Sequence, residues 1–300
     1  MISVDISSPV AGVVVLYNPP ATVLVNIRSY AHSLKVLFVI DNSDTDSGSL
    51  VNALGELGNV IYVRKSENVG VATALNLGAE RAIHAGCEFL LMMDQDSCAQ
   101  PAMVSRLLEA FACYGVESLG IAGAFPVIRF GETPLQHPEM TEQLDIITSG
   151  SLLNLAAYRK VGPFLEELFI DCVDVEYCLR LVQHGYKTVQ VNTAHLLHCL
   201  GEPAEHRFLF VNYTTSNHSS LRRYYMTRNR FYVARLYHAA FPSFCRKKRR
   251  LIRREIPRVL LFETDRLNKL RMMLRGYLDY RAGRLGKYQE KQTPPSWWGK

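Results

Sequence analysis

The chain has 300 residues, and 48% of them are hydrophobic. This is enough apolar material for the core of one large α/β domain or of two small ones. No uninterrupted apolar run is long enough to cross a bilayer, and the first residues lack the basic and apolar segments of a secretory signal. We therefore expect neither a membrane-spanning helix nor secretion.

The seven cysteines point to a reducing compartment. Their number is odd and no two of them are spaced as C-x-x-C, so we expect neither a disulfide framework nor a zinc finger. Reduced thiols of this kind are typical of a cytosolic protein.

The net charge of +6 hides a strong asymmetry along the chain. Residues 1–220 contain 12 Lys and Arg against 23 Asp and Glu, whereas residues 221–300 contain 22 against 5. A basic module suits an anionic surface such as nucleic acid, acidic lipid or a diphosphate. The sequence thus predicts an acidic body joined to a basic C-terminal region.

Short apolar runs alternate with helical patterns through the first 125 residues. The runs that predict buried strands are Val10–Tyr17, Val36–Ile40, Val60–Val63, Phe89–Met93 and Leu119–Phe125. The first helix is expected at 22–34, and a short helix that follows a polar turn is expected to end at about 58. A third helix is expected at 71–85, with Gly86 as its left-handed cap, and a fourth is expected to end at about 114. Alternation of this kind builds a mainly parallel α/β sheet with helices on both faces. No G-x-G-x-x-G follows the first strand, which argues against a dinucleotide fold of the usual kind.

The second half is less regular. Residues 129–144 are polar and are expected to form a loop. Further elements are expected at 146–155, 156–161, 188–191 and 195–200, and a helix is expected to follow the segment 169–176 and to run through Arg180 to His184. From about Ser219 the pattern is basic and helical with interleaved aromatics, and residues 292–300 resemble a loose tail.

Two carboxylates stand where the most apolar strand ends, at Asp94 and Asp96. Ligands of open α/β sheets bind beyond the carboxyl ends of the strands, and residues i and i+2 of an extended chain point the same way. The pair can therefore hold a hard divalent cation, or a cation and a sugar hydroxyl. The alternative is an ordinary strand end whose Asp residues cap the next helix.

The strand-end residues, taken in order, resemble those of GT-A glycosyltransferases of family 2, and within that family the bacterial rhamnosyltransferases. The segments that carry the resemblance are Asp94-Gln95-Asp96-Ser97, Thr148-Ser149-Gly150-Ser151, Phe169-Ile170-Asp171, Val173 to Arg180, Gly185-Tyr186, and Tyr224-Tyr225 with Arg228-Asn229. Each segment is a weak signal alone, but their order and spacing are specific. The resemblance covers most of residues 10–230. It implies a catalytic domain at 1–218, with a nucleotide-binding half to about 125 and an acceptor-side half from 126, followed by a basic helical region at 219–300.

The resemblance implies a nucleotide-sugar donor bound at the strand ends. The residues expected to bind the nucleotide are Tyr17, Asn18, Asp41, Asn68, Gly70, Asp94 and Gln95. Asp41 would accept from the pyrimidine N–H, Tyr17 would flank the base, and the helix that Asn68 and Gly70 open would approach a phosphate. Asp96, helped by His198, would hold Mg²⁺ or Mn²⁺ beside the leaving diphosphate. For each residue an ordinary turn, cap or strand-end role is the alternative.

The acceptor hydroxyl must lose a proton as it attacks, and the resemblance places the general base at Asp174. Relatives often carry an acidic residue just before the base, whereas this chain has Val173, so Asp171 is a rival for the role. Ser149, Gly150, Arg228 and Asn229 are expected to contact the acceptor or the diphosphate. A helix cap for Asp174 and a solvated basic helix for Arg228 and Asn229 are the alternatives.

The run from Arg246 to Arg258 is expected to contact an anionic membrane, with Leu251, Ile252, Ile256, Val259, Leu260 and Leu261 as the apolar side of an interfacial helix. Nucleic acid would use the same charges, but the resemblance favours a lipid-linked saccharide acceptor at the cytoplasmic face, with no nucleic acid partner. A solvated charge run is the alternative. The oligomeric state, including a homo-oligomer, stays open.

The function that follows is inverting transfer of L-rhamnose from dTDP-β-L-rhamnose to a saccharide in the synthesis of a surface polysaccharide such as O-antigen. The alternatives are another donor, such as a galactofuranosyl or hexosyl nucleotide, and a non-catalytic polyanion-binding protein. A phosphatase of the haloacid-dehalogenase type would want Thr or Val where this chain has Cys98. A sugar-phosphate nucleotidyltransferase would need a Gly-rich basic loop where Asn18-Pro19-Pro20 stands.

Overall fold

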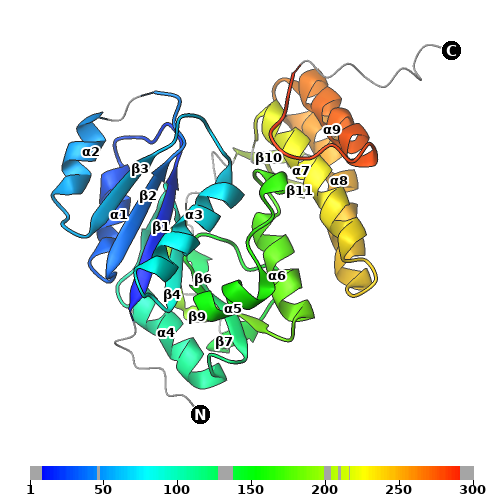
Figure 1. Cartoon of the computed structure of the whole chain (residues 1–300). Coiled ribbons are helices and arrows are strands. Elements are labelled where there is room, and N and C mark those ends of the chain that lie inside the picture. Colours follow the sequence, from blue (N-terminus) through cyan, green and yellow to red (C-terminus); the bar gives the residue numbers. More distant parts are fainter. Residues whose placement is uncertain are drawn as a thin grey trace.

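The computed structural model describes residues 9–45, 48–127, 138–198, 204–208, 211–215 and 217–290 (Figure 1). The expected loose tail at 292–300, most of the expected loop at 129–144 and the end of the expected strand at 195–200 lie outside these residues.

A single large sheet forms the centre of the molecule. From one edge to the other its strands are β3 (Val60–Arg64), β2 (Val36–Asp41), β1 (Val10–Leu16), β4 (Phe89–Asp94), β8 (Ser151–Asn154), β6 (Leu119–Val127), β9 (Lys187–His198) and β5 (Ser97–Ala99), with β7 (Met140–Glu142) also paired to β9. Strands β3, β2, β1 and β4 are parallel, while β8 runs antiparallel between β4 and β6. The parallel strands therefore end at one common edge, as the alternating pattern predicted.

Helices cover both faces of this sheet, and each face has its own core. One layer holds α1 (Val23–Ala31), α2 (Gly48–Gly55) and α4 (Met103–Tyr114), and the other holds α3 (Val71–His84), α5 (Leu155–Val161) and α6 (Val173–Gln183). Side chains of β1 alternate between the two cores, with Val13 in one and Val14 in the other. Strands β1, β2 and β4 are therefore buried on both faces, which explains their continuous apolar runs, whereas the edge strand β3 is partly exposed.

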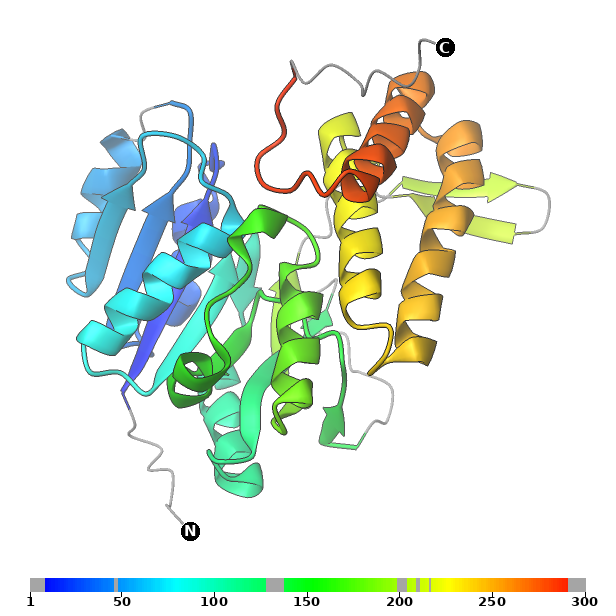
Figure 2. The same ribbon diagram turned by 45° about the vertical axis from the view of Figure 1, so that its right-hand side comes forward.

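The basic C-terminal region is a bundle of α7 (Ser220–Leu236), α8 (Pro242–Phe262) and α9 (Arg266–Arg281), preceded by the hairpin β10 (Ala204–Phe208) and β11 (Val211–Thr215). It stands beside α6 and on the side of the molecule away from α1 and α2 (Figures 1 and 2). Inside the bundle Glu263 accepts hydrogen bonds from Arg223 and from Lys269, and all three side chains are buried. Mutual pairing offsets part of the cost of burying these charges away from water.

Three features of the second half differ from the expectation. A strand, β7, lies inside the segment expected to be a loop, and the hairpin β10–β11 was not expected. The two strands expected at 188–191 and 195–200 are one strand, β9, whose pairing with β6 skips from Val191 to His195. This irregularity breaks the alternation of side chains, so the sequence shows two short runs in place of one strand.

Candidate functional site

The Asp94–Asp96 segment lies at the edge where the parallel strands end. Asp94 is the last residue of β4 and is half-buried, and Asp96 is exposed in the turn that leads into β5. The backbone of Ser97 pairs with that of His198 at the end of β9. Two carboxylates and the histidine position thus come together from segments 100 residues apart in the chain.

A short chain of hydroxyl groups supports this turn from inside the sheet. The Asp94 N–H donates to Ser149 Oγ (3.0 Å), and Ser149 Oγ donates to Ser97 Oγ (2.8 Å). Ser149 is 1% exposed, and the Gly150 N–H donates to the carbonyl of Met92 (2.9 Å). Ser149 and Gly150 therefore shape the Asp94–Asp96 turn from behind, which differs from the expected direct contact with an acceptor or diphosphate.

The Gln95 side chain joins two of the strand-end loops. Its Oε1 accepts from the Tyr17 N–H (2.8 Å) and its Nε2 donates to the Tyr17 carbonyl (3.2 Å). The Tyr17 hydroxyl donates to Asp44 (2.7 Å), and the Asn18 N–H donates to Ser43 Oγ (2.7 Å). Gln95 thereby fixes the loop after β1, and the half-exposed Tyr17 ring remains available to flank a base.

Asp41 is fully buried at the end of β2. Its Oδ1 accepts from the Ser43 N–H (2.8 Å), and its Oδ2 accepts from the Tyr62 hydroxyl on the neighbouring strand. The neighbouring Asn42 donates to the Gly70 carbonyl (3.3 Å), while its buried Oδ1 has no hydrogen-bond partner among the described residues. The carboxylate is therefore held rigidly, and a nucleotide base would share an oxygen that already accepts one bond.

Gly70 lies between the loop after β2 and the loop before α6. Its φ is +85°, Asn68 Oδ1 accepts from its N–H (2.9 Å), and the Val71 N–H donates to the carbonyl of Phe169 (2.7 Å). A Cβ at position 70 would lie 2.7 Å from the Phe169 ring and from its carbonyl oxygen. One of the N–H groups at the start of α3 is thus already paired, which leaves fewer of them for a phosphate than expected.

The loop before α6 carries both candidate bases and a strained backbone. The backbone φ angle is near +65° at three positions, Phe169, Asp171 and Cys172, a region that residues other than glycine seldom adopt. Strain of this kind persists only where the surroundings impose it, and it gathers at functional sites.

Arg228 and Asn229 of α7 impose this backbone. Asn229 Nδ2 lies 2.8, 2.7 and 2.9 Å from the carbonyl oxygens of Leu168, Ile170 and Asp171. Arg228 donates to the Leu168 carbonyl (3.1 Å) and, through Nε, to Asn229 Oδ1 (2.9 Å). The two side chains are 1% and 0% exposed. The expectation that they touch the acceptor or the diphosphate therefore does not match the structure, because their donors are buried and directed at the loop.

Burial raises the pKa of both candidate bases. The Arg222 guanidinium, which lies 3.4 Å from the Asp171 carboxylate, lowers the pKa of Asp171 and so partly offsets the rise caused by burial. The Oδ2 atom of Asp171 is buried without a partner among the described residues. For Asp174 the pKa is lowered in part by the Val175 N–H, which donates to Oδ1 (2.8 Å), and by the charge of Lys248. Burial also raises the pKa of the Cys172 thiol to about 12, which keeps it protonated. A carboxylate with a raised pKa is a stronger base, so both Asp residues suit proton abstraction.

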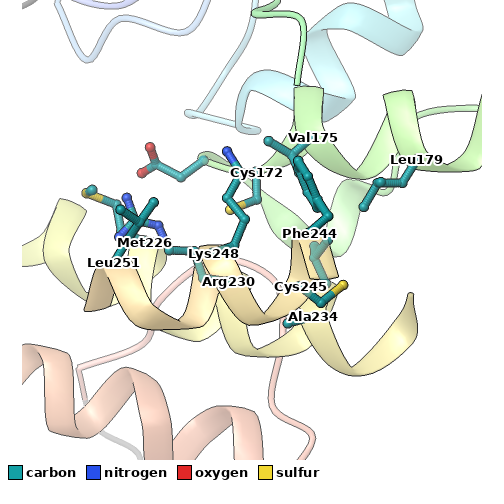
Figure 3. A pocket seen from close by; sticks show the side chains of 12 residues that line it. Cys172, Val175, Leu179, Met226, Arg230, Ala234, Phe244, Cys245, Lys248 and Leu251 are labelled. Carbon is teal, nitrogen blue, oxygen red and sulfur yellow. The ribbon is translucent and has the colours of Figure 1, made fainter. Parts of the chain in front are cut away.

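A cleft of about 150 Å³ opens beside these carboxylates, between α6, α7 and α8 (Figure 3). Its lining is mostly apolar, with three charged groups. It consists of Asp171, Cys172, Val175, Leu179, Met226, Arg230, Val233, Ala234, Phe244, Cys245, Lys248 and Leu251. Phe244 and Lys248 extend from α8 towards Val175 and Cys172.

The donor set at the Asp94–Asp96 edge suits a hard divalent ion. Carboxylate oxygens and one imidazole position are ligands that Mg²⁺ and Mn²⁺ accept. Asp94 and Asp96 stand at this edge, and the pairing with Ser97 brings the backbone of His198 beside them. Within the described ranges no group of three or more His, Cys, Asp or Glu side chains is gathered as a ready ligand cage.

Part of the apolar side expected to face a membrane is occupied. Ile252 and Val259 of α8 are buried against Met273 of α9, whereas Leu260 and Leu261 are exposed. The expectation of a membrane-facing side is therefore wrong for Ile252 and Val259, which are buried inside the bundle. No helix in the described part of the chain combines the length and apolarity that spanning a bilayer requires.

Several supporting residues were not foreseen, namely Tyr62, Asp44, Ser97 and Lys248. Tyr62 and Ser97 act across strands that are distant in sequence, and only the register brings them to Asp41 and Ser149. Lys248 stands in a basic run in which nothing distinguishes the one side chain that turns inward.

Comparisons with known proteins agree with this geometry. Residues 13–154 match the model of the family "Glycosyl transferase family 2". The chain is 28% identical to dTDP-rhamnosyl transferase RfbF of Shigella flexneri over 254 residues, which cover 77% of this chain and 82% of that one.

Two solved structures share the fold at 14% identity. Over 91% of this chain and 80% of that one, S. aureus TarS 1-349 superimposes with a TM-score of 0.57. Over 79% of this chain, GalNAc-T7 with UDP, GalNAc and Mn²⁺ superimposes with a TM-score of 0.58, and the match spans about half (49%) of the GalNAc-T7 chain. The chain therefore has a GT-A-like α/β fold, its residues 13–154 resemble family 2 glycosyltransferases, and it is similar to a dTDP-rhamnosyl transferase.

Proposed function

We propose that the enzyme transfers L-rhamnose from dTDP-β-L-rhamnose to a saccharide hydroxyl, with inversion at the anomeric carbon. The observations that support the reaction best are the Asp94–Asp96 turn at the sheet edge and the strained loop that carries Asp171 and leads to Asp174, a loop that is bonded to the start of α3 through Val71 and Phe169. Similarity to a dTDP-rhamnosyl transferase supports the donor. We further propose a lipid-linked acceptor in surface-polysaccharide synthesis at the inner face of the membrane, because the C-terminal bundle is strongly basic.

On the donor side, Asp41 and Tyr17 would hold the base, and Asp94 would hold the ribose or a metal-bound water. Asp96 and His198 would hold Mg²⁺ or Mn²⁺. When bound there, the ion supplies Lewis-acid stabilisation of the diphosphate that leaves. The hydroxyl relay through Ser149 and the two bonds from Gln95 would keep these side chains in place during the reaction.

On the acceptor side, Asp174 would take the proton of the attacking hydroxyl, and Asp171 is its rival. Each has a pKa raised by burial. A single base with no activated nucleophile implies one displacement and hence inversion. Cys172, the thiol between them, is protonated and does not supply a nucleophile.

The test is a panel of nucleotide sugars incubated with the wild type and with Asp96→Ala, with and without Mg²⁺ or Mn²⁺. Turnover of dTDP-rhamnose that needs the ion and is lost in Asp96→Ala is the expected result. Glu117→Ala, which removes an exposed carboxylate just before β6 at the opposite edge of the sheet, serves as the control and should keep its turnover.

Turnover of a galactofuranosyl or hexosyl nucleotide in preference would overturn the donor and leave the reaction class in place. If no donor is turned over, calorimetric binding of dTDP with Mg²⁺ tests the nucleotide site directly. The absence of that binding would refute the site.

A further inference from the structure

We propose that the cleft between α6, α7 and α8 binds the non-saccharide part of the acceptor, an apolar chain joined to a phosphate or diphosphate. The proposal rests on the proposed function, because it places the acceptor's sugar at Asp174. The nucleotide edge of the sheet is not part of this site.

The first observation is the composition of the cleft. Apolar side chains from three helices line it, including Val175 of α6, Met226 of α7 and Phe244 of α8. Asp171 also lines the cleft, and its buried Oδ2 has no partner among the described residues. A sugar hydroxyl carried by a ligand in the cleft would satisfy that oxygen.

The second observation links the cleft to the candidate base. Lys248 extends across the cleft towards Cys172, and its charge lowers the pKa of Asp174. Its Nζ pairs with Asp145 at 2.9 Å and lies 5.2 Å from the centre of the Phe244 ring. One ligand can therefore contact an apolar wall, a cation and the loop before α6 at the same time.

The third observation is a strip of cations that continues the cleft outwards. Ser243, Arg246, Lys247, Arg250, Leu251 and Arg254 line a second depression of about 490 Å³, and Leu251 belongs to both. Arg246, Arg250 and Arg254 recur every four residues, so they share one face of α8. None of the four cations forms an ion pair with a described residue, in contrast to Arg223 and Arg230 of α7.

Charge complementarity selects the occupant. An uncharged chain would leave the cationic strip unused, and a free nucleotide would leave the apolar walls unused. An acceptor whose saccharide is joined through phosphate to an apolar chain would use both, with its sugar directed at Asp171 and Asp174. Each cation that faces such an anion adds to affinity, as does each methylene that is buried.

The test measures binding of dodecyl diphosphate and of methyl diphosphate by calorimetry, in EDTA so that ion-dependent binding at the Asp94–Asp96 edge does not contribute. The double variant R250E/R254E is compared with R249E/R253E. The latter reverses two exposed charges of the same helix that do not line the depression.

We expect dodecyl diphosphate to bind the wild type at least about tenfold more tightly than methyl diphosphate. We expect R250E/R254E to lose about thirtyfold in affinity, while R249E/R253E stays within about threefold of the wild type. Val175→Trp, which fills the cleft, should remove the preference for the long chain.

Equal losses in the two double variants, or no dependence on chain length, would overturn the proposal. Loss of sedimentation with phosphatidylglycerol vesicles in R250E/R254E, with dodecyl diphosphate binding unchanged, would assign the strip to a membrane surface instead. Binding of dTDP with Mg²⁺ is measured on each variant. Failure of dTDP to bind would count against the proposed function. Retained dTDP binding shows that a loss of dodecyl diphosphate binding concerns the cleft alone.

Discussion

Replacement of Asn229 by Ala tests whether α7 holds the loop before α6, residues 169–172, in its strained form. The side chain is fully buried and lies within 2.9 Å of three carbonyl oxygens in the segment from Leu168 to Asp171. Its Oδ1 also accepts from Arg228 Nε at 2.9 Å. The substitution removes all of these bonds and leaves the loop with three positive-φ residues and weaker support.

The magnitude follows from the number of groups left without a partner. Each buried group left unpaired costs about 1–3 kcal/mol, and Asn229 has only two N–H groups to distribute, so we expect a loss of about 2–4 kcal/mol in the free energy of unfolding. Relaxation of the loop would release roughly 1–3 kcal/mol of strain for each positive-φ residue, which favours a changed position of Asp171 and Asp174. A displacement of about 1 Å at the base lowers kcat by roughly a hundredfold.

The assay combines urea unfolding, kcat for transfer, and calorimetric binding of dTDP with Mg²⁺. Asn154→Ala is the matched control, because Asn154 is equally buried and its side chain donates to two carbonyls and accepts from two N–H groups. In the pairing of β4 with β8, Asn154 lies opposite Phe89, at the end of β4 that is farthest from Asp94. We expect similar losses of stability, a fall in kcat only for Asn229→Ala, and unchanged dTDP binding in both. A kcat for Asn229→Ala within twofold of the control would refute the reasoning.

Two further predictions concern the candidate base Asp174 and the contact between Gly70 and Phe169. Burial raises the pKa of Asp174, so the carboxylate destabilises the fold above that pKa, and Asp174→Asn should raise Tm by about 2 °C or more at pH 7 while it abolishes transfer. The gain in Tm should vanish as the pH falls through the folded and then the ordinary pKa of Asp; an unchanged or lower Tm at pH 7 would contradict the direction of the shift. Gly70→Ala should cost about 2–4 kcal/mol in urea unfolding, since its Cβ would meet Phe169 at 2.7 Å. Gly58→Ala, at a similar φ with no atom within 4 Å, should cost only about 1 kcal/mol, and equal costs would show that contact with Phe169 is unimportant.

Much of the architecture was predictable from local pattern. The first five strands expected along the chain are all present. Apart from the edge strand β3, they are buried, and a strand buried on both faces must be a continuous apolar run. Gly86 ends a helix with positive φ, as its position after a helical pattern predicted, and Gly162 and Gly185 do the same. The carboxylates at Asp94 and Asp96 were placed at the edge of the sheet for the same reason, since a polar residue after such a run marks the strand end.

The roles of individual side chains were decided by tertiary contacts. Arg228 and Asn229 look like exposed ligands in a basic helix, yet α7 packs against the loop before α6 and buries them under carbonyl groups. Ser149 was expected to face an acceptor, and the register between β4 and β8 places it behind Asp94 instead.

The sequence by itself therefore determined which residues are polar at which strand ends, because burial of a strand is a local property of side chains. Which of those residues face a substrate, and which hold the others, depends on segments 50 or more residues apart, such as Ser149 with Ser97 or Asn229 with Asp171. Hydrogen bonds between such segments form only after the sheet and the helix bundle have packed, and no periodicity along the chain encodes them.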